Sequence, residues 1–373
     1  MLGFKYNPAS LIVHPRIRLN AASLTMYDWA HCLICDGICD NEAGLFFKEL
    51  SKNQRHVSSI YEFGWYGLQF SHPKSLPSLK SILQPKRLDA NLVNSHFSCS
   101  ASEFLTLYPI LRRYVIGMVL KRGELHNHCM SLLYCLDILE KCHCLKACNV
   151  TPASLQRSIE KWRDAFDLAY GRAHARPKVH YVLHLPKMLL EHGCLLSTLV
   201  NERRHRVVKR YTRDRCAVAD KWEVGALEEI IAFQAHEAGH VNFFKVGMLE
   251  PHPARPNTWR ALSDLLPGVA HAEVNVANRL RTDYGTLTAH DYVFYMARDG
   301  VRVGFLEFIL GIRGSTKCIV AMFDLITRAD SWMTCEATEN LIMIPSTEML
   351  CSATYIVDGS TLDVYVPYFL RQP

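Results

Sequence analysis

A carboxylate stands directly ahead of a run of basic side chains in residues 176–215, a pattern that could bring a metal ion and phosphate together. The carboxylate is Glu202, and its basic neighbours would hold it in the ionised form. The same neighbours would attract a polyanion such as DNA. A solvated helix face is the alternative interpretation of a charged run. The basic side chains are Arg203, Arg204, Arg206, Lys209, Arg210, Arg213 and Arg215.

A second pattern, HEAGH at 236–240, is typical of zinc peptidases. On a helix this spacing puts both histidines on one face, where His236 and His240 could share a zinc ion. Glu237 would then act as general base toward a water bound to the metal. The pattern needs a third ligand and supporting contacts to count as a site. The candidates for that ligand are Glu250, His271 and Glu273.

Other histidines and cysteines have spacings that a metal could use, at 31–39, 126–129 and 142–148. None of these groups forms a paired CxxC framework. Buried, reduced thiols on apolar helix faces are the simpler interpretation. His180 and His184, four residues apart, could flank a catalytic core or pack half-buried with hydrogen bonds to the backbone.

Two blocks of the sequence resemble cut-and-paste DNA transposases of the CACTA and Kyakuja–Dileera–Zisupton kind. The first, PKVHYVLHLPKMLLEHGCLLSTLVNERRHRVVKR at 177–210, is similar to the block near the end of their catalytic domain. The second, YDWAH at 27–31, is similar to their Asp-x-Met-His block, with Ala30 where methionine is usual. The order and separation of the two blocks make the pair more specific than either block alone.

The resemblance implies a ribonuclease H-like domain in which three carboxylates bind two Mg²⁺ ions and catalyse in-line displacement at phosphorus. Asp28 matches the second carboxylate and Glu202 the third, as catalytic residues and metal ligands. Residues 194–200 would form the last core strand, and a helical insertion would occupy about 40–175. The residues expected to contact DNA are Arg203, Arg204, Arg206, Lys209, Arg210 and Arg213.

The first carboxylate of the resembled family lies upstream of the second, but Asp28 is the first acidic residue of this sequence. We therefore expect an incomplete triad, weak Mg²⁺ binding and no DNA cleavage. The chain would be part of a longer transposase or a decayed or domesticated copy. An N-cap is the alternative role for a lone aspartate ahead of a helix.

The composition is that of an ordinary globular protein of 373 residues, with 49% hydrophobic and 21% charged residues. The sequence has no apolar run long enough to predict a membrane span, and its first residues lack the apolar core of a signal peptide. Fourteen cysteines without such a signal predict reduced thiols and a nuclear or cytoplasmic protein that is not secreted. The net charge of +6 is modest, so its concentration after Glu202 is the informative feature.

The segments that must position these residues are mainly helical up to about residue 246. Apolar spacing predicts helices over 28–50, 102–148 and 222–246. Thr151 and Pro152 are a typical N-cap and first-turn pair for a further helix. Prolines among serines and lysines predict an irregular connection over 71–85.

The character of the sequence changes after residue 287, where short β-rich segments alternate with turn residues. This pattern predicts a small antiparallel barrel or sandwich. Aromatic residues of this module, such as Tyr292 and Phe294, are interpreted as core. The segments are 291–297, 301–310, 317–327, 339–346, 352–357 and 362–370.

The expected fold class is therefore α+β and mainly helical, in three parts. A partial ribonuclease H-like domain would span 1–220, a helical segment with a proline-rich linker 221–285, and the β module 286–373. Three functions follow: a transposon-derived DNA-binding protein with ancestral Mg²⁺-dependent strand transfer, a zinc metallopeptidase, or a non-catalytic scaffold whose β module binds a protein partner.

Overall fold

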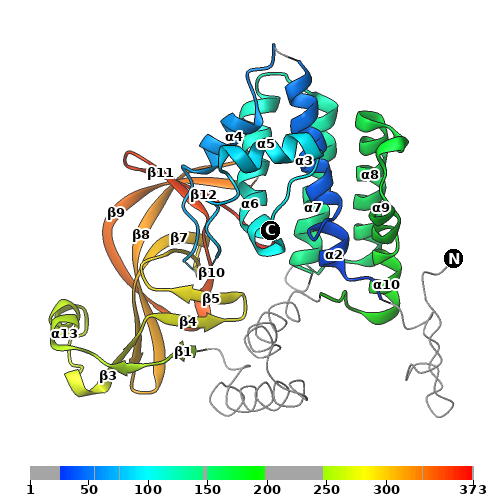
Figure 1. The fold of residues 1–373 in the computed structure, drawn as a ribbon. Coiled ribbons are helices and arrows are strands. Elements are labelled where there is room, and N and C mark those ends of the chain that lie inside the picture. Colours follow the sequence, from blue (N-terminus) through cyan, green and yellow to red (C-terminus); the bar gives the residue numbers. More distant parts are fainter. Residues whose placement is uncertain are drawn as a thin grey trace, which may run out of the picture.

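The computed structural model describes residues 26–53, 55–74, 76–145, 149–197, 247–329 and 331–371. The chain is a mixed α and β protein in which a helical unit, residues 26–197, packs against a β unit, residues 247–371 (Figure 1). The described elements of the helical unit are α2 (Trp29–Leu33), α3 (Ile38–Lys52), α4 (Ile60–Gly67), α5 (Pro85–Asn94), α6 (Ala101–Tyr114), the π-helix η2 (Val115–Leu120), α7 (His126–His143), α8 (Pro152–Tyr170), the 3₁₀ helix η3 (Arg172–His174), α9 (Pro177–Val182) and α10 (Leu185–His192).

Local sequence signals account for most of these helices. The predicted helical stretch 102–148 contains α6, η2 and α7, and the irregular connection before α5 is also confirmed. Thr151 caps α8 as predicted, because its hydroxyl accepts a hydrogen bond of 3.1 Å from the Ser154 amide. The apolar stripe of α8 is buried and consists of Leu155, Ile159, Trp162 and Phe166.

Two glycines shape the start of the helical unit, where the single helix predicted over 28–50 is broken into α2 and α3. A Cβ atom on Gly37 would lie 2.1 Å from the backbone carbon of Leu33, so only glycine fits at this break. Further along α3, a Cβ on Gly44 would lie 2.2 Å from the backbone nitrogen of His96. Glycine therefore lets α3 pack directly against the backbone that follows α5.

We expect Gly44→Ala to lower the free energy of unfolding by about 1–3 kcal/mol, because the methyl group meets backbone that must shift. Urea denaturation followed by circular dichroism measures the change. Gly117→Ala is the matched control, since no atom lies within 4 Å of its added Cβ and the residue is exposed. Equal stability of the two variants would contradict the close approach at Gly44.

The β unit is built from two antiparallel sheets. Among the described residues, the smaller has the order β1-β4-β5 and the larger β10-β6-β7-β8-β9-β12-β11, and β3 pairs with both β7 and β2. The strands are β1 (Gly247–Leu249), β2 (His252–Pro253), β3 (Val274–Ala277), β4 (Arg279–Thr282), β5 (Gly285–Thr288), β6 (Tyr292–Ala297), β7 (Gly300–Ile312), β8 (Ser315–Ala329), β9 (Trp332–Pro345), β10 (Met349–Ser352), β11 (Tyr355–Asp358) and β12 (Thr361–Tyr365). The predicted C-terminal antiparallel sheet is confirmed.

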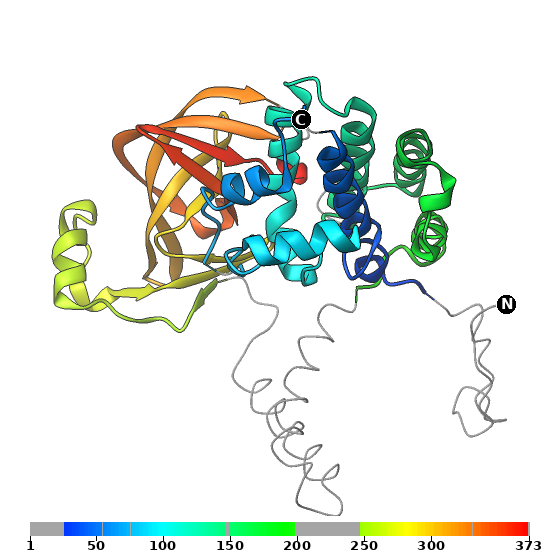
Figure 2. The same ribbon diagram turned by 45° about the horizontal axis from the view of Figure 1, so that its top comes forward.

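Turn chemistry and burial explain the shape of the larger sheet. Arg313 and Gly314 link β7 to β8 with φ values of 48° and 81°, as a two-residue hairpin turn of this kind requires. Strand β6 is buried on both faces, because Val293 belongs to one core and Phe294 to another. The edge strands β10 and β11 are joined only by Ala353-Thr354, so the sheet curls until its two edges approach each other. Figures 1 and 2 show this strong curvature in β8 and β9.

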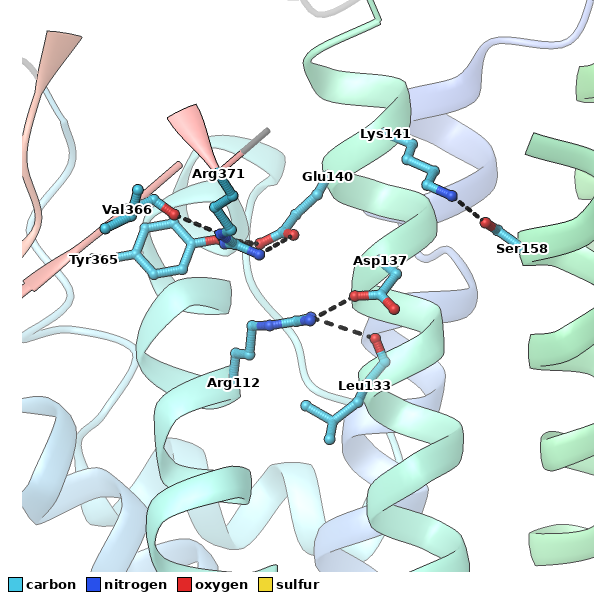
Figure 3. A network of polar contacts seen from close by, with 9 residues as sticks. All are labelled: Arg112, Leu133, Asp137, Glu140, Lys141, Ser158, Tyr365, Val366 and Arg371. Atoms are coloured by element: carbon cyan, nitrogen blue, oxygen red, sulfur yellow. Dashed lines mark hydrogen bonds and ion pairs between the residues drawn. The ribbon is translucent and has the colours of Figure 1, made fainter. Parts of the chain in front are cut away.

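The two units share a core and a polar network. Trp332 and Tyr365 of the sheet belong to the apolar core of the helical unit. Figure 3 shows Arg371, near the C-terminus, directed at Glu140 of α7. Its two terminal nitrogens lie 3.1 and 3.0 Å from the two carboxylate oxygens. The Tyr365 hydroxyl donates to the same carboxylate, so the last residues of the β unit are held against the helices.

The sequence interpretation assigns residues 221–285 to a helical segment and linker. The predicted helix 222–246 lies outside the described residues, and the β unit begins directly after it. Strands β1 to β4 lie there, together with the described helix α13 (Pro256–Leu262) and the 3₁₀ turns η4 (Ser263–Leu265) and η5 (His271–Glu273). Strands of two to four residues are too short to show an alternating pattern. In the described part of the chain, no helix combines the length and apolar character needed to cross a bilayer.

Candidate functional site

The two sequence blocks of the transposase resemblance lie side by side in the structure. The Tyr27 amide contacts the Met188 sulfur at 3.2 Å across 161 residues of sequence. The Trp29 amide donates to the Leu196 carbonyl oxygen at 3.1 Å. The ring of Tyr27 stacks on those of Tyr181 and His184, with centroids 4.9 and 5.3 Å apart. These contacts join the start of α2 to α9, α10 and the segment that follows them.

Asp28 lies at the centre of this junction as the N-cap of α2. One carboxylate oxygen accepts a hydrogen bond of 2.8 Å from the Ala30 amide, and the other lies 2.6 Å from Nδ1 of His31. The Asp28 side chain is only 13% exposed. Capping, the alternative role weighed from the sequence, is therefore what Asp28 does in this structure.

The acidic partner expected for Asp28 lies outside the described residues, as does the basic segment. Of the expected last core strand, only Cys194–Ser197 is described, and these residues form no strand. Asp28 itself belongs to no described group of three His, Cys, Asp or Glu that could hold a metal ion. Asp28, the described member of the expected carboxylate pair, therefore does not by itself fit a two-metal centre. The residues outside are Glu202, Arg203, Arg204, Arg206, Lys209, Arg210 and Arg213.

The zinc-peptidase residues His236, Glu237 and His240 also lie outside the described residues, but the candidates for a third ligand can be located. Each of these side chains has another interaction. Glu250 pairs with Arg279 at 3.1 Å and Glu273 with Arg313 at 3.0 Å. The Nε2 atom of His271 lies 2.7 Å from the Ala254 carbonyl oxygen. The two glutamates are therefore engaged in ion pairs, whereas His271 could keep this contact through Nε2 and bind zinc through Nδ1.

The cysteines of the helical unit behave as core residues. Cys32, Cys39, Cys129 and Cys142 are buried, as the interpretation of these groups predicts. Cys35 and Cys144 are half-buried, and Cys148 lies outside the described residues. Burial, with a smaller effect from the charge of Asp28, raises the pKa of Cys32 to about 12, and Lys178 acts in the opposite direction. The sulfur atoms of Cys39 and Cys135 lie 3.5 Å apart. Thiols of this kind are poor nucleophiles and poor metal ligands.

A buried carboxyl group on α3 escaped the sequence analysis. Glu42 is fully buried and receives hydrogen bonds from the Ser131 hydroxyl and, at 2.7 Å, from the indole nitrogen of Trp162. Burial raises the pKa of Glu42 to about 7, although these hydrogen bonds lower it. The signal was its position four residues from both Ile38 and Phe46, on the buried face of the helix.

The chain matches no protein-family model, no curated protein and no solved structure. The geometry defines a junction between two distant segments, with the helix-capping Asp28 at its centre and aromatic and histidine side chains around it.

Proposed function

We propose that this chain derives from a DNA transposase of the CACTA or Kyakuja–Dileera–Zisupton kind and that it binds DNA through its basic segment. The observation that supports this most is the direct contact between the two resembling blocks, through Trp29 and Leu196. Blocks that build one catalytic site must be neighbours in the fold even when they are far apart in sequence. The helices between them agree with the helical insertion that the resemblance implies.

Chain length is compatible with a shared site for the two carboxylates. Asp28 directly precedes Trp29, whose amide is bonded to Leu196. Six residues lead from Leu196 to Glu202, an extended span of at most about 22 Å. Glu202 can therefore reach Asp28 if the chain turns back after Leu196. We further propose that the helical unit derives from the ribonuclease H-like domain that the resemblance implies.

The ancestral chemistry would be metal-dependent cleavage and joining of DNA, with Mg²⁺ held by carboxylates. Asp28 and Glu202 are the residues of this chain that the resemblance assigns to Mg²⁺. We expect this pair to bind Mg²⁺ weakly and not to cleave DNA. The curled sheet would form a small barrel, and its role would be contact with a protein partner.

We expect DNA binding that is independent of sequence and strongly dependent on salt. The test variant replaces six basic residues with glutamine: Arg203, Arg204, Arg206, Lys209, Arg210 and Arg213. It should bind DNA more weakly, and the negative slope of log Kobs against log salt should become less steep. The decrease would be about 0.9 per lost phosphate contact, or at most about 5 for all six. Fluorescence anisotropy with a labelled duplex at several salt concentrations measures both quantities.

A second variant with the same change in net charge provides the control. It replaces six exposed basic residues scattered over the described surface: Lys80, Lys86, Lys121, Arg157, Arg255 and Arg298. If affinity depends on the basic segment, this variant should retain most of the affinity and the slope. Equal losses in the two variants would mean that net charge alone attracts DNA and would remove support for the proposed interface.

A further inference from the structure

Two histidine side chains converge on the outer edge of the junction between the blocks. His180 lies in α9, and His184 lies in the turn between α9 and α10. Their Nε2 atoms are 3.1 Å apart, and their rings are nearly perpendicular, with centroids 4.6 Å apart. The transposase interpretation makes neither histidine a catalytic residue or a metal ligand, and their contact involves no atom of Asp28.

The separation of the two nitrogens suits a shared metal ion. Zinc binds histidine nitrogen at about 2.0–2.1 Å, so two ligands in a tetrahedral arrangement lie about 3.3 Å apart. The observed separation of 3.1 Å lies close to that value. Without a metal, the two neutral rings can share a single proton between these nitrogens. A divalent cation between the rings would replace that proton.

The surroundings of His184 orient its ring. Tyr27 stacks on the imidazole with the ring centroids 5.3 Å apart and so restricts its rotation. His180 is exposed, so an ion can approach the pair from solvent.

We propose that His180 and His184 form a solvent-open, two-imidazole site for a borderline divalent transition metal such as Cu²⁺ or Zn²⁺. The described residues provide no third His, Cys, Asp or Glu for this site, so water or an external ligand would complete the coordination. Imidazole selects these ions over Mg²⁺, and Cu²⁺ should bind most tightly of the divalent series. This site would therefore bind a different class of metal ion from Asp28 and Glu202, which the resemblance assigns to Mg²⁺.

The test is a Cu²⁺ titration of the full chain without an affinity tag, followed by calorimetry and electron paramagnetic resonance. The wild-type protein should bind one more equivalent of Cu²⁺ than H180A/H184A, with a signal from two coordinating nitrogens. Mutating a residue that only supports a metal ligand typically weakens metal affinity about 10- to 100-fold. Removing a ligand itself, as in H180A, should therefore weaken Cu²⁺ binding at least about tenfold.

The matched control is H174A/H192A, which removes two exposed histidines from η3 and α10 and should retain the extra equivalent. Circular dichroism establishes that each variant is folded. The exposed position of His180 makes H180A a safe second variant. Identical stoichiometry, affinity and nitrogen signal in wild type, H180A and H180A/H184A would overturn the proposal and leave the pair as a hydrogen bond only.

Discussion

Replacing Arg371 with alanine is expected to lower the free energy of unfolding by about 3–5 kcal/mol, because it leaves a buried charge without its partner. Glu140 is fully buried, whereas the Arg371 side chain is 15% exposed. Both terminal nitrogens of the guanidinium contact the carboxylate, and one of them also lies 2.6 Å from the Tyr365 hydroxyl. The loss should appear in urea denaturation monitored by circular dichroism.

Two further variants separate this effect from the general cost of losing an arginine. Arg302→Ala removes an ion pair with Asp299 on the exposed hairpin between β6 and β7 and should cost less than about 1 kcal/mol. A double substitution, Glu140→Leu with Arg371→Leu, removes both charges and should be more stable than Arg371→Ala alone. An Arg371→Ala variant that loses no more stability than Arg302→Ala would contradict the buried pair.

This network also shows which part of the fold the sequence could not predict. Glu140 and Arg371 are 231 residues apart, and nothing local in either segment specifies the other. Helices α3, α6, α7 and α8 and most of the long strands could be predicted, because caps and apolar spacing are local signals, but α4 and α5 were not predicted. The order of the strands depends on contacts between distant segments. One predicted segment, 352–357, in fact crosses from one edge of the sheet to the other.

The candidate site also has features that the sequence predicted and features that depend on packing between distant segments. The sequence drew attention to Asp28 and to the block beginning at Pro177, and the two are neighbours in the structure. It did not predict that Tyr27 would stack on Tyr181 and His184, because stacking depends on the packing of α2 against α9. Sequence patterns also cannot distinguish an aspartate that caps a helix from one that binds a metal. The same position ahead of a helix serves both roles.

Glu42 shows how a polar residue within an apolar face changes the properties of the whole helical unit. Its carboxyl group has a pKa of about 7 in the folded protein, against an ordinary value of 4.5. Between these values the folded state binds more protons than the unfolded state, so the free energy of unfolding falls as pH rises. Below about pH 4.5 the Glu42 carboxyl is protonated in both states. Above about pH 7 it is ionised in both, and the folded state bears the full free-energy cost of the buried charge. Burial also raises the pKa of nearby Asp40, which adds to the same trend.

We therefore expect Glu42→Gln to stabilise the protein by about 3 kcal/mol at pH 8, following the usual conversion of a pKa difference into free energy. The advantage should shrink as the pH falls through 7 and should vanish below about pH 4.5. The neutral amide can still accept from the Trp162 nitrogen and donate to the Ser131 hydroxyl, so the hydrogen bonds need not be lost. Urea denaturation across pH 4.5–8 measures the difference from wild type, which isolates Glu42 from Asp40.

Glu160→Gln on the exposed face of α8 is the control, because it removes the same charge from a side chain in contact with water. Its stability profile should run parallel to that of the wild-type protein. A Glu42→Gln profile that also ran parallel would mean that the buried carboxyl does not take up a proton on folding. If instead the slope flattens only in Glu42→Gln, the helical core contains a group that titrates near neutral pH. Stability would then depend on the protonation of one side chain between α3, α7 and α8.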